Sequence, residues 1–567
     1  EFPLVLTVFV AMGAWRISKV RVLARRGDAI ETLGATTVLC TDKTGTLTQN
    51  RMTITALVPP DADPAGPIDA ADTTDTRRLL EAGTLASARH PHDPMETAFH
   101  DLAAARGLAA TEGCELIREY GLTPELLAVT RVWRRADGAA VVAAKGAPEA
   151  IAGLCRIDPA TAATLRAAVA AMAEQGLRVL AVASGETDPT DLPATPHGFD
   201  LSLLGLVGLA DPLRPGAREA IAACRAAGVG VAMITGDHPV TARAIARQAG
   251  IAADEVLTGA EIAAASETEL AERLDRVRVF ARVRPEQKLR IVRAFSARGE
   301  VVAMTGDGVN DAPSLKAAAI GVAMGGRGTD VAREAASIVL LDDDFGAIVA
   351  AMRLGRRIWD NLQKAMAFVV AVHVPIAGLA LLPFALDLPV LFGPVHIAFL
   401  EMVIDPVCSL VFEAEPEEED VGTRPPRDPK TPLLSRRLLA WGATQGIVAF
   451  ATVAAVELWA VSRVMPVEEI RALAFFALVF VLIGLVFVGR TFDDRGFGLL
   501  RRPNPTLAAV LGAVVAVLAL SLGWPAAREL MRFGPLHADD LALTVAAGGA
   551  TLLLLEALKR PLRRLGR

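Results

Sequence analysis

Long apolar runs lie at both ends of the chain and enclose a middle section with a different pattern. An apolar stretch opens the chain over residues 1–14. Six more runs fall at about 365–386, 390–412, 438–461, 472–489, 506–524 and 541–557. Their lengths approach the roughly 20 residues that a helix needs to cross a bilayer. The pattern therefore predicts six membrane-spanning helices in the C-terminal part and the second half of another at the start.

Basic clusters orient these predicted spans. Lys and Arg gather at 353–364, 424–437, 490–502 and 559–567, and again directly after the opening stretch. Such clusters mark the cytoplasmic ends of membrane helices. Six spans after the charged stalk at 346–364 bring both the stalk and the C-terminus to the cytoplasmic side. The middle section is then cytoplasmic as well.

The middle section alternates short apolar runs with helical periodicity. Buried strands are expected at 38–40, 203–209, 229–234 and 301–304. Strand and helix in alternation predict a doubly wound parallel sheet, in which reactive groups gather at the carboxyl ends of the strands. Two further strand signals, at 141–144 and 176–182, lie inside a segment that we expect to form an inserted domain.

Composition narrows the class of protein. Hydrophobic residues make up 52% of the 567 residues, which is high for a soluble protein. The net charge of -6 is mild and indicates no nucleic-acid partner. The five cysteines are scattered without metal-ligand spacing, as expected of free thiols in a reducing cytosol.

Asp42 stands at the tip of the first buried strand, in the stretch Cys40-Thr41-Asp42-Lys43-Thr44-Gly45-Thr46-Leu47-Thr48. An exposed carboxylate in that position can attack phosphorus and carry the phosphoryl group as an acyl phosphate. Lys43 would offset its charge, and Gly45 lets the chain turn away sharply. The alternative is an ordinary Asp-rich turn.

Two other polar groups follow strands of the same predicted sheet. Thr235-Gly236-Asp237 ends one strand and Asp307 ends another, and Lys288 lies between them in the stretch Arg284-Pro285-Glu286-Gln287-Lys288. Taken singly, each has an ordinary structural explanation, such as a helix start or a solvated lysine. With Asp42 they are expected to converge at the carboxyl ends of the strands.

Ionisable residues also occur inside the predicted spans, where they are costly and indicate function. Glu401 and Asp405 lie four residues apart, so they share a helix face. His373 lies mid-span, and Pro375 and Pro406 each free a backbone carbonyl nearby. Paired carboxylates with free carbonyls predict an oxygen-rich site for a hard cation. Alternatively, Glu401 serves packing or lies near an interface.

The run Asp42-Lys43-Thr44-Gly45-Thr46-Leu47-Thr48 resembles the phosphorylation motif of the P-type ATPases, and the later motifs follow in that family's order. The resemblance implies a multidomain membrane protein with a haloacid dehalogenase-like (Rossmann-like) α/β phosphorylation domain, an inserted α+β nucleotide-binding domain and an α-helical transmembrane bundle. The implied boundaries are 1–27 for a partial transmembrane helix and stalk, 28–55 with 203–345 for the phosphorylation domain, 56–202 for the nucleotide-binding domain, and 346–567 for a stalk and six transmembrane helices.

The resemblance also implies roles for single residues. The catalytic set would be Asp42 as nucleophile, with Lys43, Thr235 and Lys288. Mg²⁺ would be held by Asp42, the Thr44 carbonyl and Asp307, with Asn310 and Asp311 in support. The ATP site would comprise Glu96, Tyr120, Lys145, Gly146, Arg178, Thr235, Gly236 and Asp237. The family's basic stretch is altered here, since Leu122 and Glu125 stand where cations would meet the phosphates.

Residues 404–416 and 424–427 resemble the calcium-pump branch, which implies that Glu401, Asp405 and His373 bind the transported ion. His373 and Glu401 replace Asn ligands of that branch, and Ile376 replaces a Glu. We expect a divalent cation such as Ca²⁺, with Mg²⁺, a monovalent ion and H⁺ left open. The family's first three spans and its actuator domain with a Thr-Gly-Glu loop have no counterpart here, so we expect them in a longer natural chain.

The sequence thus predicts an ATP-driven cation translocase of a cell membrane, with an aspartyl-phosphate intermediate, cytoplasmic catalytic domains and Mg²⁺ and ATP as cofactors. A bacterial inner membrane is the expected location. The alternative is a membrane-tethered haloacid dehalogenase-type phosphotransferase, or an ion-responsive module, that does not transport.

Overall fold

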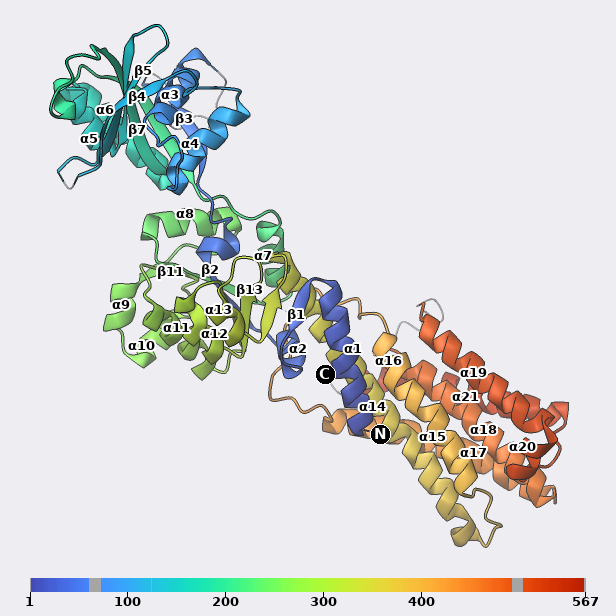
Figure 1. Cartoon of the computed structure of the whole chain (residues 1–567). Coiled ribbons are helices and arrows are strands. Elements are labelled where there is room, and N and C mark those ends of the chain that lie inside the picture. The colour runs from blue at the N-terminus through green and yellow to red at the C-terminus, as the bar shows by residue number, and fades with distance from the viewer. Residues whose placement is uncertain (1, 61–72, 124, 492–502, 565–567) are drawn as a thin grey trace. The chain divides into compact units, whose positions relative to one another are not determined.

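The computed structural model describes residues 2–60, 73–123, 125–491 and 503–564. It forms two compact units, one of residues 37–225 and 229–346 and the other of residues 1–36, 226–228 and 347–567 (Figure 1). Parts of the predicted basic clusters at 490–502 and 559–567 lie outside the described residues.

A parallel sheet lies at the centre of the first unit. Its strands run in the order β14-β13-β12-β2-β9-β11-β10, and every neighbouring pair is parallel. The strands are β2 (Val38–Asp42), β9 (Gly230–Ile234), β10 (Val256–Thr258), β11 (Val279–Ala281), β12 (Val302–Gly306), β13 (Ile320–Met324) and β14 (Ile338–Leu340). The predicted doubly wound arrangement is confirmed, with β2 between β12 and β9.

Helices flank this sheet, namely α7 (Ala217–Ala226), α8 (Pro239–Ala249), α9 (Gly259–Ala264), α10 (Glu267–Arg273), α11 (Pro285–Ala297), α12 (Ala312–Ala317) and α13 (Asp330–Ala335). Because helices take up both faces, β2 is apolar on both, and Leu39 and Cys40 are fully buried. Asp42 pairs with Ile234 at the carboxyl end, where the strand leaves the core.

The inserted domain is built on an antiparallel sheet in the order β3-β8-β7-β6-β5-β4. The strands are β3 (Thr53–Val58), β4 (Glu115–Tyr120), β5 (Ala128–Arg134), β6 (Ala140–Gly146), β7 (Arg178–Thr187) and β8 (Ser202–Ala210), and the helices are α3 (Thr74–Leu85), α4 (Pro94–Ala105), α5 (Pro148–Leu154) and α6 (Pro159–Glu174).

The sequence prediction for the strand at 203–209 is wrong. We expected it in the parallel sheet, but it forms β8 of the antiparallel sheet, between β3 and β7. Leu206 packs into the core on the α5–α6 side, while Val207 and Leu209 pack into the core on the α3–α4 side. A central strand covered on both faces is continuously apolar, so its pattern matches that of a buried parallel strand.

The second unit is helical. It contains α1 (Phe2–Lys19), α2 (Asp28–Gly34), α14 (Gly346–Leu386), α15 (Pro394–Pro406), α16 (Phe412–Ala414), α17 (Arg436–Ser462), α18 (Val467–Gly489), α19 (Pro505–Gly523), α20 (Pro525–Leu530) and α21 (Ala538–Arg564). Seven helical stretches among the described residues are long and apolar enough to cross a membrane, with Pro394–Ala414 (α15 to α16) counted as one, and each predicted apolar run overlaps one of them. Gly442 and Gly446 of α17 pack directly against α14, as small residues do between membrane helices.

Candidate active site

The first candidate site surrounds Asp42 at the tip of β2. Asp42 Oδ1 accepts the backbone N–H of Lys43 at 2.7 Å, and Asp42 Oδ2 accepts from the Lys288 ammonium at 2.8 Å. Lys288 belongs to the first turn of α11, which Pro285 opens. The same ammonium lies 2.8 Å from Asp311 Oδ1. One buried lysine therefore joins two of the predicted site carboxylates.

Negative charge exceeds positive charge at this point. Carboxylate oxygens of Asp42, Asp307 and Asp311 all lie within 4.8 Å of one another. Burial raises the pKa of Asp42 to about 6. Lys288 acts in the opposite direction, and the negative charges of Asp311 and Asp307 raise this pKa further. Burial, and then Asp311, also raise the pKa of Asp307. A cluster of hard oxygen donors with surplus negative charge fits a divalent cation such as Mg²⁺.

The loop after Asp42 is shaped around Asp307. Gly45 has φ +73°, and a Cβ built on it would lie 2.2 Å from Asp307 Oδ2, so only glycine fits. Arg214 donates to the Gly45 carbonyl at 2.7 Å and fixes the loop from the other side. Thr44 lies half-buried in this loop, and Asn310 is exposed in the short turn after β12.

The Thr235-Gly236-Asp237 turn lies beside Asp42 because β9 pairs with β2. Thr235 is buried, and its Oγ1 accepts the Asp237 N–H at 3.1 Å. Asp237 in turn forms an ion pair of 2.7 Å with the Lys43 ammonium. The structure thus brings the predicted catalytic residues to one edge of the sheet, with the Lys43 side chain held by Asp237.

The second candidate site lies in the inserted domain, on the face of the antiparallel sheet that α3 and α4 cover. The Lys145 ammonium donates to Ser87 Oγ at 2.5 Å and to Glu96 Oε1 at 3.0 Å. Gly146 allows close strand contact, since a Cβ there would lie 2.3 Å from the Leu127 carbonyl oxygen. Arg178 begins β7 and is exposed. Lys145, Gly146 and Glu96 are therefore brought together.

Tyr120 is placed away from this cluster. It pairs with Thr130, whereas Lys145 pairs with the adjacent Val129, so the two side chains project from opposite faces of the sheet. The Tyr120 hydroxyl donates to the Pro193 carbonyl at 2.6 Å, and its ring packs edge-on against Phe199. Its ring therefore contributes to the core on the α5–α6 side, and stacking beside Lys145 would require a different arrangement.

The predicted ion ligands lie in the helical unit. Asp405 is the second-last residue of α15, just before the π-helical turn Val407–Val411, and its Oδ1 is buried without a hydrogen-bond partner among the described residues. Glu401 is half-buried one turn earlier. His373 is exposed, and its Nδ1 lies 2.7 Å from the Val369 carbonyl of its own helix. The Asp405 oxygen without a hydrogen-bond partner, next to the π-helical turn, is suited to binding a cation.

Arg131 and Glu457 are two of the buried charged residues that the sequence did not indicate. Arg131 lies beside Lys145, and a single arginine in an apolar strand gave no pattern that could have indicated it. Glu457 lies in α17, within the apolar run 438–461 that was predicted only as a membrane span. Its Oε2 is buried and lacks a hydrogen-bond partner within the described chain. A lone acidic residue in an apolar run was the available signal for Glu457.

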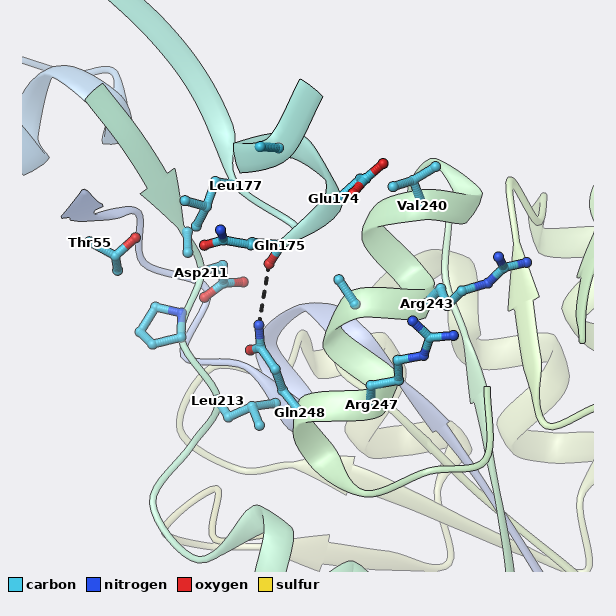
Figure 2. Close-up of a pocket in the computed structure, with 14 residues that line it drawn as sticks. Thr55, Glu174, Gln175, Leu177, Asp211, Leu213, Val240, Arg243, Arg247 and Gln248 are labelled. Atoms are coloured by element: carbon cyan, nitrogen blue, oxygen red, sulfur yellow. Dashed lines mark hydrogen bonds between the residues drawn. The ribbon is translucent and has the colours of Figure 1, made fainter. Parts of the chain in front are cut away.

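A cavity of ≈ 1030 Å³ also occurs in the first unit, lined by residues of β3, α6, α8 and the chain around Asp211 (Figure 2). Arg243 and Arg247 of α8 are among its lining residues, and Gln248 donates to the Gln175 carbonyl at 3.4 Å across it. None of the predicted site residues lines this cavity.

Comparison with known proteins adds independent information. A family model described as haloacid dehalogenase-like hydrolase matches residues 36–319, and one described as cation transporting ATPase, C-terminus, matches residues 389–560. A probable cation-transporting ATPase F of Mycobacterium tuberculosis is 40% identical over 484 residues, which cover 76% of this chain and 53% of that protein.

Two relatives carry calcium in their names. A calcium-transporting ATPase of Bacillus subtilis is 34% identical over 478 residues, covering 77% of this chain and 54% of that protein. A calcium-transporting ATPase of Listeria monocytogenes is 32% identical over 594 residues, covering 98% of this chain and 66% of that protein. The chain spans about half the length of the first two relatives and more of the third.

Proposed function

This chain belongs to the P-type cation-transporting ATPases, and from that membership we propose that it forms an aspartyl phosphate from ATP and uses it to move a cation across a membrane. The observation that carries the proposal is the convergence of Asp42, Lys288 and Asp307 at one sheet edge, from three distant sequence motifs. Such a set serves phosphoryl transfer better than any purely structural purpose.

In the proposed reaction, Asp42 Oδ attacks the γ-phosphorus of ATP. The new O–P bond forms as the bond to the β-phosphate oxygen breaks, and ADP leaves with that electron pair. Lys288 offsets charge on Asp42 and on the phosphoryl oxygens, while the Thr235 hydroxyl donates to those oxygens. Lys43 and Asp237 hold the nucleophile loop in place.

The acidic cluster fits Mg²⁺, which would be held by Asp42, Asp307 and the Thr44 carbonyl with Asn310 and Asp311 in support. When bound, the metal neutralises charge on the phosphoryl oxygens. ATP would be held by the inserted domain through Lys145, Gly146 and Glu96, with Arg178 toward the phosphates and Gly236 and Asp237 on the other side.

Transport would use Asp405 and Glu401, with His373 as a further ligand candidate. We propose a divalent cation such as Ca²⁺, because two relatives are named for calcium and the donors are carboxylate oxygens. The seven apolar helices make this a multi-pass membrane protein, and we place it in a cell membrane with the catalytic unit cytoplasmic.

The rival function is a membrane-bound phosphotransferase without transport. The unpartnered, buried Asp405 oxygen favours the pump, because a tether needs no such group inside a span. The test is ATP-dependent uptake of cations into vesicles that contain the protein, screened over Ca²⁺, Mg²⁺, Mn²⁺ and monovalent ions. A cation that stimulates phosphorylation and is taken up, with both effects lost in Asp405→Asn, supports the pump. Phosphorylation that no cation alters, without uptake, would favour the rival.

A further inference from the structure

Arg131 is a buried cation in the middle of β5. It is 5% exposed, and its guanidinium donates to three acceptors from three separate parts of the chain. Nη1 donates to the Ala86 carbonyl at 2.5 Å and to Glu96 Oε1 at 3.4 Å, and Nε donates to Glu119 Oε2 at 3.0 Å. A side chain this constrained holds its neighbours in fixed positions.

Arg131 and Lys145 share the same carboxylate oxygen. Glu96 Oε1 accepts from Lys145 at 3.0 Å as well as from Arg131, while Glu96 Oε2 accepts the Ala88 N–H at 3.2 Å. The pairing is unequal, since Lys145 is closer. Each cation nevertheless weakens the electrostatic attraction between Glu96 and the other cation.

The cluster holds two buried cations and two carboxylates that are less buried. Glu96 is half-buried, and Glu119, which pairs with Arg131 at 3.0 Å, is 47% exposed and screened by solvent. Asp93 at the start of α4 adds a more distant negative charge, and His100 is engaged with the Ala88 carbonyl. The two cations are therefore only partly offset by the carboxylate that they share, which favours an anionic ligand.

Building on the proposed nucleotide site, we infer that Arg131 is a positioning residue of the ATP pocket, which holds Glu96 in place and competes with Lys145 for its carboxylate. Because Glu96 is shared, it only partly offsets the positive charge of the Lys145 ammonium. That ammonium can then attract an anionic nucleoside triphosphate. Arg131 thus supplies part of the charge that is missing where Leu122 and Glu125 replace a basic stretch.

The titration of Lys145 is consistent with this arrangement. Burial lowers the pKa of Lys145 to about 8, Glu96 opposes that shift, and Arg131 adds to it, while Asp93 acts in the upward direction. Removing the Arg131 charge should strengthen the Lys145–Glu96 pair. The pKa of Lys145 should then rise.

Competitive acylation of lysine amines, followed by mass spectrometry of the Lys145 peptide, measures this pKa in the full chain. We expect half-maximal reactivity near pH 8 in the wild type. In Arg131→Gln, which removes the charge and keeps a donor for Ala86, we expect the midpoint to rise by about half a unit to one unit. Arg131→Lys should restore most of the wild-type value. Arg134→Gln, in the same strand but exposed and paired with Glu115, should leave the midpoint unchanged.

The same labelling separates this inference from the function on which it rests. ATP should protect Lys145 from acylation in the wild type, and Arg131→Gln should need several-fold more ATP for equal protection. A wild-type lysine that ATP never protects would contradict the nucleotide site itself. A protected lysine whose midpoint and ATP requirement are the same in Arg131→Gln and wild type would overturn the role of Arg131. Thermal unfolding of each variant shows that the comparison is made on folded protein.

Discussion

The Lys288 ammonium lies 2.8 Å from the Asp42 carboxylate, although 246 positions separate the two residues in the chain. The same ammonium contacts Asp311, so it is shared by two carboxylates of a three-acid cluster. This relationship makes Lys288 the main counter-charge of the proposed nucleophile, and it leads directly to the first prediction.

Replacing Lys288 by Met should slow phosphoenzyme formation by about 10²–10³-fold, because an aimed charge that stabilises the transition state is lost. The measurement is the initial rate of label transfer from radiolabelled ATP. Lys316→Met, an exposed change on the neighbouring helix α12, is the matched control and should react at the wild-type rate. Equal rates in both variants would exclude Lys288 from the transfer step.

Replacing Gly45 by Ala should abolish phosphorylation, since the added Cβ would meet Asp307 Oδ2 at 2.2 Å. The left-handed backbone alone should cost about 1–2 kcal/mol of stability. Gly107→Ala shows the effect of the left-handed backbone without a steric clash, because Gly107 has φ +66° with open space around it. Both variants should lose stability in thermal unfolding, and only Gly45→Ala should lose the phosphoenzyme. Activity that survives in Gly45→Ala would show that the loop tolerates displacement of Asp307.

The lowered pKa of Lys145 should appear in the pH dependence of stability. Between about pH 8 and the ordinary value of 10.5, the unfolded chain keeps the Lys145 proton while the folded chain has released it. The unfolded state then binds more protons, so stability rises with pH in this window. Relative to Lys145→Met, the wild type should gain about 2 kcal/mol from pH 8 to pH 10, measured by denaturant unfolding. A difference that stays constant over this range would contradict the shift.

Glu457 and Glu413 offer a matched pair of buried acids. Glu457 Oε2 has no hydrogen-bond partner within the described chain, whereas Glu413 holds Arg16 through both oxygens at 2.5 and 2.8 Å. Glu457→Gln should therefore leave the melting temperature unchanged or raise it, because a neutral amide is easier to bury than an unpaired acid. Glu413→Gln should cost about 1–3 kcal/mol, because it weakens a charge-assisted pair. Equal losses would mean that Glu457 has a stabilising partner.

Much of the architecture could be read from the sequence because its signals are local and repeated. The family assignment and the parallel sheet are confirmed, and every predicted apolar run overlaps a long apolar helix. The meeting of Asp42, Thr235, Lys288 and Asp307 followed from one rule, that parallel strands bring their carboxyl ends to a single edge. No comparable rule applied to the inserted domain.

The failures share a physical cause, which is that strand register and pairing cannot be read from composition. The wrong sheet for 203–209 arose because a central strand covered on both faces is as apolar as a parallel one. Tyr120 was assigned to the nucleotide site from the family resemblance, and its pairing with Thr130, which the sequence does not show, turns it to the other face of the sheet from Lys145. Arg131 was missed for the same reason, since its partners come from β4, α4 and the chain before α4.

The central claim is that Asp42 carries the phosphoryl group, and mass-spectrometric and radiochemical identification of the labelled residue tests it most directly. The purified protein is incubated with Mg²⁺ and γ-labelled ATP, quenched in acid and digested. The account predicts an acid-stable, hydroxylamine-sensitive label on the peptide that contains Asp42, and no label in Asp42→Asn. Label that persists in Asp42→Asn, or that resides on another peptide, would contradict it.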